Sequence, residues 1–402
     1  MKYVILIGDG MADYPLDELG GKTVLQAADK PNMDAIAKKG RNGLLETVPQ
    51  GFEPGSDVAN LSIMGYDPEL YYPGGRGLVE AAAMGIQLST GDLAMRANII
   101  TVEDGRIIDY SAGKITNEEA RELIKLANAE FGGEGVEFYP GVSYRNLLML
   151  RGVDIHPYDL KCNAPHDHPG KEFKDLLIEG RGEAKKVADR LNDIMIRSQE
   201  VFEKSEVNKK RQREGKPLAN MLWFWGAGRK KRDMPTMKEK FGVEGVVITA
   251  IDLIRGLGIL SGLKPINVEG ANAYFDTNFE GKADAAIKAL NGGANIAIIH
   301  VEAPDEAGHE GLMEEKIKAI ENIDKRLLGR LMENLEGDYR IGLLPDHYTP
   351  ISVRTHVHGP VPFAIMGSGI EPDGVERFDE ESAKKGGYGL KKGHEFIELL
   401  TS

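Results

Sequence analysis

Runs of consecutive apolar residues recur along this chain, and three of these runs are followed shortly by aspartate or histidine residues. The runs cover residues 3–7, 296–299 and 341–344. The polar residues that follow them are Asp9, then Asp305 and His309, then Asp346 and His347, with His356 and His358 close behind. Uninterrupted Val, Ile and Leu runs of this length predict strands buried on both faces, as in a parallel sheet.

Parallel α/β sheets place their sites outside the carboxyl ends of the strands. Asp and His side chains delivered there by three strands form the donor mixture that a divalent metal ion requires. Each cluster alone has an ordinary explanation: Gly8-Asp9-Gly10 as a tight turn, Asp305 and His309 as a loop salt bridge, and Asp346-His347 as a helix cap. The chain has only nine histidines, and their gathering in these clusters favours one shared metal site.

The pattern between the runs alternates strands and helices at first and then changes. Residues 31–39 predict a helix with Pro at its entry and Gly40 beyond its exit. A loop over 48–55 then opens into a helix at Ser56. From about residue 91 the pattern predicts an α+β insert: a hairpin over 97–109, a helix from a capping box at 116–119, and strands at 136–139 and 144–150.

After the insert, a long amphipathic helix contains Val187, Leu191, Ile194 and Val201 on one face. Core strands are then expected at 222–225, 245–248 and 361–365. At 402 residues the chain exceeds one compact core. We therefore predict two domains: a core of residues 1–90 and 180–402, and an inserted domain of residues 91–179. The fold class is α/β, with a mainly parallel central sheet flanked by helices and a smaller inserted α+β domain.

Composition excludes several partners. A formal net charge of −13 argues against non-specific nucleic-acid binding, which depends on neutralising phosphates. The basic tracts at 209–211 and 229–232 are interpreted as solvated surface. No apolar run is long enough to span a membrane, and no leader pattern is present. The single cysteine, Cys162, excludes an internal disulfide framework and indicates a structural thiol in a reducing cytoplasm. Whether the chain forms homo-oligomers stays open.

Ser56 is the candidate nucleophile, because it follows Gly55 at a predicted helix start. As an N-cap, its hydroxyl would only accept a hydrogen bond from a backbone N–H group. As a nucleophile, it would use the same helix terminus to stabilise a phosphoryl group, with a metal lowering the pKa of the hydroxyl.

These motifs, taken together and in this order, resemble those of a known family. They are Gly8-Asp9-Gly10, Gly55-Ser56-Asp57, Pro304-Asp305-Glu306-Ala307-Gly308-His309, Pro345-Asp346-His347 and Thr355-His356. The set resembles the alkaline phosphatase superfamily of metalloenzymes, and within it the archaeal-type cofactor-independent phosphoglycerate mutases. The resemblance covers nearly the whole chain and implies an alkaline-phosphatase-like core.

The resemblance implies two divalent metal ions, usually Mn²⁺, with Zn²⁺, Co²⁺ or Mg²⁺ as alternatives, and no need for bisphosphoglycerate. By position, one ion would be held by Asp9, Ser56, Asp346 and His347, and the other by Asp305, His309 and His356. His358 departs from the family pattern, where a small polar residue is usual. It would either compete with His356 as a ligand or face the cleft.

The implied reaction transfers a phosphoryl group in two halves. Ser56 takes the phosphoryl group from phosphoglycerate, and glycerate turns in a closed cleft and retrieves the group on its other hydroxyl. Closure must exclude water, because otherwise the intermediate hydrolyses. The insert is expected to supply groups that bind the substrate, and the candidates are Arg96, Arg145, His166 and Asp167, with Arg255 from the core.

Three alternatives remain open on the sequence. The same residues would serve a metal-dependent phosphatase or a sugar-phosphate mutase of the same superfamily. A non-catalytic, metal-stabilised binding protein is the alternative of another class, and it would have no use for Ser56.

Overall fold

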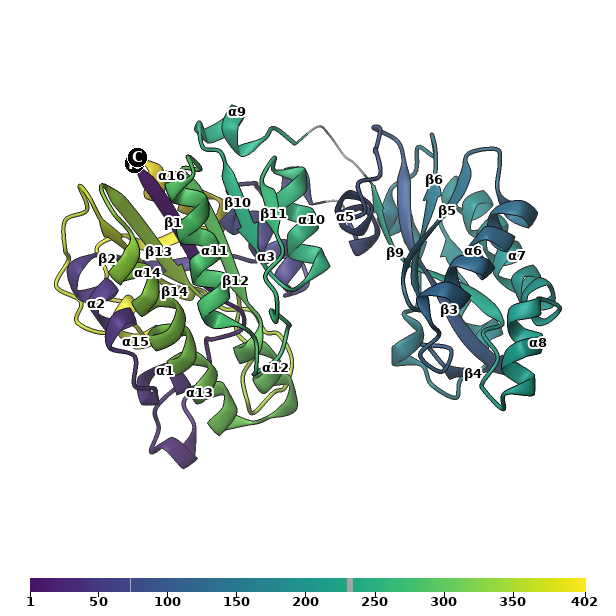
Figure 1. Cartoon of the computed structure of the whole chain (residues 1–402), viewed down its shortest axis with the longest axis horizontal. Coiled ribbons are helices and arrows are strands. Elements are labelled where there is room, and N and C mark those ends of the chain that lie inside the picture. Colours follow the sequence, from purple (N-terminus) through teal and green to yellow (C-terminus); the bar gives the residue numbers. More distant parts are fainter. Residues whose placement is uncertain (73, 230–233) are drawn as a thin grey trace. The chain divides into compact units, whose positions relative to one another are not determined.

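The computed structural model describes residues 1–72, 74–229 and 234–402, and the chain divides into two compact units. Unit 1 comprises Met1–Tyr72 and Met234–Ser402, and unit 2 is the chain between them (Figure 1). The insert predicted over 91–179 is therefore too short at both ends. Helix α5 (Arg76–Ala83) on one side and strand β9 (Met221–Arg229) on the other belong to unit 2 because both pack on its strand β3 (Leu93–Glu103). Residues 230–232 of one predicted basic tract lie outside the described residues.

Unit 1 is built on an eight-stranded, mainly parallel sheet. Its strands, in spatial order, are β11 (Lys264–Ile266), β10 (Gly245–Ile248), β12 (Ile296–Val301), β1 (Lys2–Gly8), β13 (Tyr339–Leu344), β14 (Val361–Gly367), β2 (Arg41–Glu46) and β15 (Gly389–Lys392). Only β14 runs antiparallel to its neighbours, β13 and β2. The predicted fold class, α/β with a mainly parallel sheet, is confirmed.

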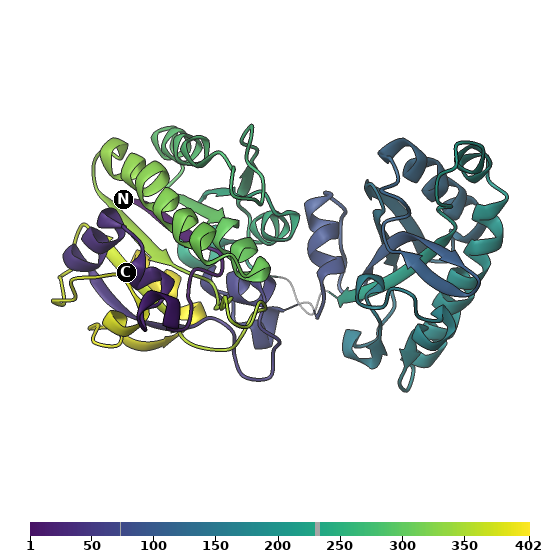
Figure 2. The ribbon, with the colours of Figure 1, turned by 90° about the horizontal axis from the view of Figure 1, so that it is seen from below.

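Helices cover both faces of this sheet (Figures 1 and 2). Alternate residues of β1, Val4 and Leu6, share one apolar cluster with residues of α2 (Pro31–Lys39), α11 (Phe279–Asn291), α13 (Met313–Asn322) and α14 (Gly329–Asn334). On the other face, a Cβ placed on Gly342 of β13 would lie 2.6 Å from the ring of Phe396 in α16 (Phe396–Thr401). A Cβ on Gly258 of α10 (Asp252–Leu260) would lie 2.4 Å from Val247. The apolar runs of the sequence are thus buried on both sides.

The remaining helices of unit 1 are short. They are α1 (Val24–Ala27), α3 (Ser56–Ile63), α4 (Pro68–Tyr71), α9 (Met237–Phe241), α12 (Ala303–Glu310) and α15 (Glu380–Ala383). The helix predicted over 31–39 has the bounds of α2, with Pro31 as its first residue. Because proline has no N–H to leave unsatisfied at that position, it starts the helix without cost.

Unit 2 contains a second sheet, which is antiparallel throughout. Its strands are β3, β4 (Arg106–Asp109), β5 (Val136–Val142), β6 (Arg145–Leu150) and β9, and a short pair is formed by β7 (Leu160–Lys161) and β8 (Glu179–Gly180). Its helices besides α5 are α6 (Asn117–Phe131), α7 (Ala184–Glu203) and α8 (Glu206–Arg213). The predicted capping box is confirmed, since Thr116 and Glu119 cap α6 reciprocally.

The strand predicted over 222–225 exists, but its assignment to the core sheet was wrong. Strand β9 pairs antiparallel with β3, from Leu93 opposite Arg229 to Ile100 opposite Met221. An apolar run buried beneath helices has the same pattern in either sheet, so the sequence period could not decide which strand it pairs with.

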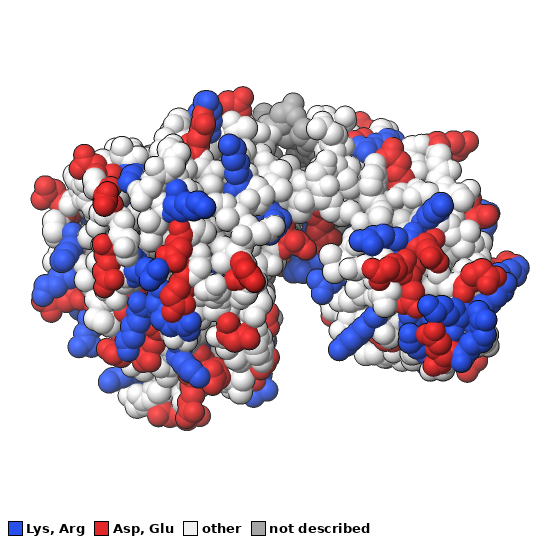
Figure 3. Space-filling view, viewed as in Figure 1, with Lys and Arg blue, Asp and Glu red and all other residues white. Residues whose placement is uncertain are grey.

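Surface charges of both signs are interspersed on the face of each unit seen in Figure 3. Many are paired, as in Arg326–Glu280 at 2.6 Å and Arg330–Asp284 at 2.5 Å, which join α11 to the following helical segments. Among the described residues, no helix has the length and apolar character needed to cross a membrane. Cys162 is half-buried, and burial raises the pKa of its thiol to about 12, as expected of a structural thiol.

Candidate metal centre

Three neighbouring parallel strands bring the Asp and His clusters to one edge of the sheet in unit 1. Strand β1 lies between β12 and β13, with Gly8 opposite Val301 and Ile7 opposite Leu344. Asp9 follows β1 directly. Helix α12, which begins two residues after β12, carries its two ligand candidates one turn apart, and Asp346 follows β13. The strand ends therefore meet as the apolar pattern predicts.

The first group of side chains surrounds Asp9 and Asp346, which are both buried. The Nε2 atom of His347 lies 3.3 Å from Asp9 Oδ1 and 3.5 Å from Asp346 Oδ2. Ser56 Oγ lies 3.1 Å from the same Nε2 atom. Backbone N–H groups of Gly10 and His347 donate to Asp346 Oδ1 at 3.1 and 2.9 Å. The predicted first set, Asp9, Ser56, Asp346 and His347, is thus brought together.

The second group surrounds Asp305. His309 Nε2 lies 3.2 Å from Asp305 Oδ2, and His356 Nε2 lies 3.4 Å from Asp305 Oδ1. The two ring nitrogens are 3.0 Å apart. The ring N–H side of each histidine faces a backbone oxygen, with His309 Nδ1 at 3.1 Å from Arg354 O and His356 Nδ1 at 3.3 Å from Pro54 O. The predicted second set is also brought together.

The two groups adjoin each other through Asp9, Asp305 and His347, whose ligand atoms lie within 4.8 Å of one another. Gly10 makes this approach possible. Its φ is +59°, and a Cβ there would stand 2.6 Å from both Asp305 Oδ1 and Thr349 Oγ1. Because any side chain at this position would be strained and would also collide, only glycine lets the loop after β1 lie against α12.

The carboxylates of the site respond differently to their surroundings. Burial, together with the charges of Asp346, Asp305 and Glu302, raises the pKa of Asp9 well above its ordinary value. Burial opposes ionisation of Asp346, but its interactions with His347, His300 and the Gly10 N–H hold its pKa below the ordinary range. The Asp305 hydrogen bond raises the pKa of His309 to about 9. The carboxylates of the site therefore carry more negative charge than the neighbouring histidines neutralise. Bound divalent cations would supply the missing positive charge.

The donor set fits divalent cations on further structural grounds. Two buried atoms here, Asp9 Oδ1 and His300 Nε2, have no hydrogen-bond partner among the described residues. Such orphaned atoms are rare in folded proteins and point to an ion or water that would satisfy them. Mixed carboxylate and imidazole donors suit Mn²⁺ or Zn²⁺ better than Ca²⁺, which prefers oxygen ligands alone.

The Ser56 side chain does not cap helix α3. The N-cap of α3 is Gly55, and Ser56 is the first residue of the helix. Its half-buried hydroxyl contacts His347. Thr349 Oγ1 donates to Asp305 and lies 3.2 Å from His347 Nδ1, so Thr349 accepts the ring proton of His347 there. The Nε2 atom then carries a lone pair toward Ser56 and Asp9, and burial lowers the pKa of His347, which favours this neutral form of the ring.

The predicted substrate residues of the insert form one cluster in unit 2. Arg96 stacks on the Trp225 ring at 4.7 Å and donates to Glu80, and His166 packs on the same ring at 5.2 Å. Asp167 lies 3.7 Å from His166 Nε2. Arg145 stacks on Tyr144, which reaches His166 through Tyr110. Four side chains chosen from scattered positions therefore surround one set of aromatic rings.

Two other predicted residues stand outside these groups. Arg255, on α10, donates to Asn267 and lies 3.9 Å from Asp252. His358 is exposed and belongs to neither Asp/His group. Sequence reasoning missed His300 and Glu302, which line the site from β12 and the residue after it. The signal was present, because they are two polar residues, one position apart, within an apolar run.

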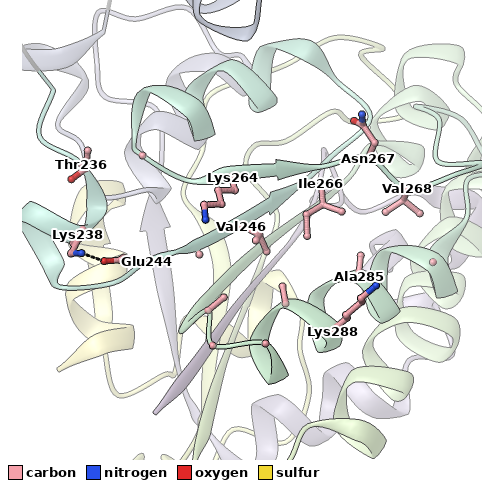
Figure 4. A pocket seen from close by; sticks show the side chains of 17 residues that line it. Thr236, Lys238, Glu244, Val246, Lys264, Ile266, Asn267, Val268, Ala285 and Lys288 are labelled. Carbon is pink, nitrogen blue, oxygen red and sulfur yellow. Dashed lines mark ion pairs between the residues drawn. The ribbon is translucent and has the colours of Figure 1, made fainter. Parts of the chain in front are cut away.

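A cavity of about 950 Å³ lies elsewhere in unit 1, between β10, β11 and α11 (Figure 4). Its walls are mainly apolar, with Val246, Ile266 and Ala285 among them, and its one carboxylate, Glu244, is paired with Lys238. No histidine is among the described residues that line it, so the cavity lacks the mixed Asp and His donors found at the strand ends.

Comparison with known proteins places these groups in context. Residues 37–208 match a family model described as 2,3-bisphosphoglycerate-independent phosphoglycerate mutase. A protein of that name from Methanosarcina acetivorans is 49% identical over 405 residues, covering 100% of both chains. A solved structure from Pyrococcus horikoshii is 30% identical, with a TM-score of 0.82, covering 99% of this chain and 96% of its own. A cofactor-independent phosphoglycerate mutase from Thermoplasma acidophilum is 27% identical, with a TM-score of 0.69, covering 100% and 99%.

Proposed function

The chain belongs to the 2,3-bisphosphoglycerate-independent phosphoglycerate mutase family and is therefore an isomerase, and from that premise we propose how it works. It interconverts 3-phosphoglycerate and 2-phosphoglycerate through a phosphoserine at Ser56, beside two divalent metal ions, without bisphosphoglycerate. Mn²⁺ is the proposed metal, with Zn²⁺, Co²⁺ and Mg²⁺ as alternatives. The reaction is a step of glycolysis and gluconeogenesis, and we propose a cytoplasmic setting, which suits the unpaired Cys162.

The observation that carries this proposal is the position of the Ser56 hydroxyl. It stands 3.1 Å from His347 Nε2, at the first residue of α3, where backbone N–H groups point out of the helix. A serine that served only the fold would cap the helix, and here Gly55 occupies that position. A binding protein without turnover gives no reason for a hydroxyl held against the metal ligands.

Two bound divalent ions would supply positive charge that lowers the pKa of the serine hydroxyl and neutralises phosphoryl oxygens. Asp9, Asp346 and His347 would hold one ion with Ser56, and Asp305, His309 and His356 would hold the other. Ser56 attacks the phosphorus of the substrate, so that the O–P bond to glycerate breaks as the bond to Ser56 forms. Ser56 gives up its hydroxyl proton in this step, and glycerate leaves as an alkoxide that takes up one proton, so the protons balance.

In the second half, the other hydroxyl of glycerate gives up its proton and attacks the phosphorus of phosphoserine. The bond to Ser56 breaks, and the phosphoryl group ends on the oxygen of a different carbon. Glycerate must stay bound and shielded from water between the two halves. Arg96 and His166 on the Trp225 ring, with Arg145 on the neighbouring Tyr144 ring, support a role for unit 2 here. Arg side chains grip carboxylates in a fixed, bidentate geometry. We propose that this cluster binds the glycerate carboxylate.

The assay that tests the proposal follows both phosphoglycerate isomers and free phosphate in one reaction. The full chain is incubated with 3-phosphoglycerate and Mn²⁺, and bisphosphoglycerate is omitted. We expect 2-phosphoglycerate to accumulate to equilibrium with little free phosphate. Phosphate release as the main reaction would support the phosphatase alternative, and turnover of a hexose phosphate alone would support the sugar-phosphate mutase. If metal binds but neither isomer formation nor phosphate release is detected, only the non-catalytic binding protein remains as an explanation.

A further inference from the structure

We propose that His300 is a further ligand of the ion held by Asp9 and Asp346, and that the buried Lys282–Glu302 pair fixes its ring for this role. The inference rests on the two-ion site proposed above and adds to it a side chain that the sequence motifs leave without a role. It changes the number of protein donors at that ion. It also explains why the polar residue His300 interrupts the buried strand β12 and why Glu302 follows that strand.

The position of His300 is the first argument. Its side chain is fully buried, and its Nε2 atom lies 3.5 Å from Asp9 Oδ2 and 3.7 Å from Asp346 Oδ2. Neither His300 Nε2 nor Asp9 Oδ1 has a hydrogen-bond partner within the described part of the chain. Because a buried polar atom without a partner is costly, one cation shared by both atoms would remove two penalties together.

The other face of the ring is the second argument. His300 Nδ1 lies 3.4 Å from Glu302 Oε1. Glu302 is held as a carboxylate by three donors, which are Lys282 Nζ at 2.8 Å, Thr249 Oγ1 at 2.8 Å and the Ala250 N–H at 2.9 Å. A carboxylate with these partners accepts the ring proton at Nδ1. The lone pair of Nε2 then points at Asp9 and Asp346, where only a cation makes it stable.

Comparison among the four histidines of the site is the third argument. His309, His347 and His356, the proposed ligands, each direct Nε2 toward the carboxylates and Nδ1 toward an oxygen acceptor. Those acceptors are Arg354 O, Thr349 Oγ1 and Pro54 O. His300 has the same arrangement, and its acceptor, Glu302, is the only carboxylate among these four acceptors. A histidine whose ring is oriented in this way by a carboxylate is the usual form of a metal ligand.

The competing interpretation makes His300 an imidazolium that neutralises Asp9 and Asp346 without touching an ion. In that case Nε2 carries a proton when the ions are bound. The two interpretations therefore differ in whether an ion replaces that proton, and a paramagnetic metal reports the difference directly.

The experiment uses the full chain loaded with Co²⁺. Protons on the rings of Co²⁺-bound histidines give strongly shifted NMR signals, and each proposed ligand keeps one exchangeable proton at Nδ1. We expect four such signals in the wild-type chain and three in His300→Gln. Equilibrium dialysis should show one of two Co²⁺ ions bound about 100-fold more weakly in His300→Gln and about 10-fold more weakly in Glu302→Gln.

Two controls assign the effect. His358→Gln makes the same substitution at an exposed histidine two residues after His356 and should leave both ions and all four signals unchanged. His309→Gln should weaken the other ion and leave the signal of His300 in place.

Failure of each proposal has its own signature. If the wild-type chain binds two Co²⁺ ions but gives three signals, His300 is not a ligand and the two-ion site stands. An unchanged Co²⁺ affinity in a folded His300→Gln chain leads to the same conclusion. The number of shifted signals is counted in the wild-type chain, so that test does not depend on whether a variant folds. If the wild-type chain binds no pair of ions, the proposed function fails first.

Discussion

Replacing Ser56 by alanine separates a nucleophile from a structural serine, and the structure sets the magnitude of both effects. The hydroxyl is half-buried, contacts His347 Nε2 at 3.1 Å and caps no helix, since Gly55 is the N-cap of α3. We therefore expect the free energy of unfolding of Ser56→Ala to change by less than about 0.5 kcal/mol. Loss of a serine that did cap a helix would cost about 1 kcal/mol.

The effect on activity should be far larger. With no other residue in the proposed mechanism to carry the phosphoryl group, the rate of isomer formation should fall by at least about 1,000-fold, or about 4 kcal/mol in the activation barrier. The ions should remain bound, because the Asp and His ligands are intact. The assay is the rate of 2-phosphoglycerate formation, together with the intact mass of protein quenched during turnover, which should show one added phosphoryl group in wild type only.

The chain offers a matched control in the same helix. Ser62 is fully buried in α3, and its hydroxyl has no hydrogen-bond partner among the described residues. Ser62→Ala should keep full activity and lose no stability, because it removes an unsatisfied polar atom. A Ser56→Ala enzyme that keeps more than about a tenth of the wild-type rate, or that still becomes phosphorylated, would refute the mechanism.

Three further predictions concern stability and metal. Lys316→Met should destabilise the chain by about 3–5 kcal/mol in urea unfolding, because it removes the cationic partner of the buried Asp13, which now lies 2.8 Å from Lys316 Nζ. The same substitution at the exposed Lys318 on the same helix should change stability little. Burial raises the pKa of Glu380 to about 7, so its folded form holds a proton that the unfolded form loses above about pH 4.5. Stability should therefore fall by up to about 3 kcal/mol as pH rises toward 7, and Glu380→Gln should abolish that slope; an unchanged slope would contradict it. Chelation of divalent metal should abolish isomerisation and lower the melting temperature. Adding Mn²⁺ at about 1,000 times its Kd should raise the free energy of unfolding by about 4 kcal/mol. Activity that persists without metal would exclude the two-ion site.

The sequence predicted the gathering of the Asp and His side chains better than it predicted the division of the chain. Asp9, Asp305 and Asp346 could be found because each follows an apolar run, and adjacent parallel strands leave such residues no other place than one sheet edge. Strand β9 could not be assigned, because its partner β3 is more than 100 residues away and local pattern does not report partners. His300 was passed over because a single histidine in an apolar strand usually belongs to the core, and ring orientation cannot be read from sequence.

The side chains proposed for chemistry and those proposed for recognition lie in different units. Ser56 and the seven Asp and His side chains discussed at the metal centre all belong to unit 1, whereas the aromatic and arginine cluster belongs to unit 2. Unit 2 is a single continuous insertion with its own apolar core. In evolution, the insertion could therefore be replaced as one DNA segment by another. The same phosphoryl transfer would then act on a substrate with a different alcohol group. Protein engineers could do likewise, grafting foreign insertions between Tyr72 and Met234 and screening for new phosphomonoester substrates.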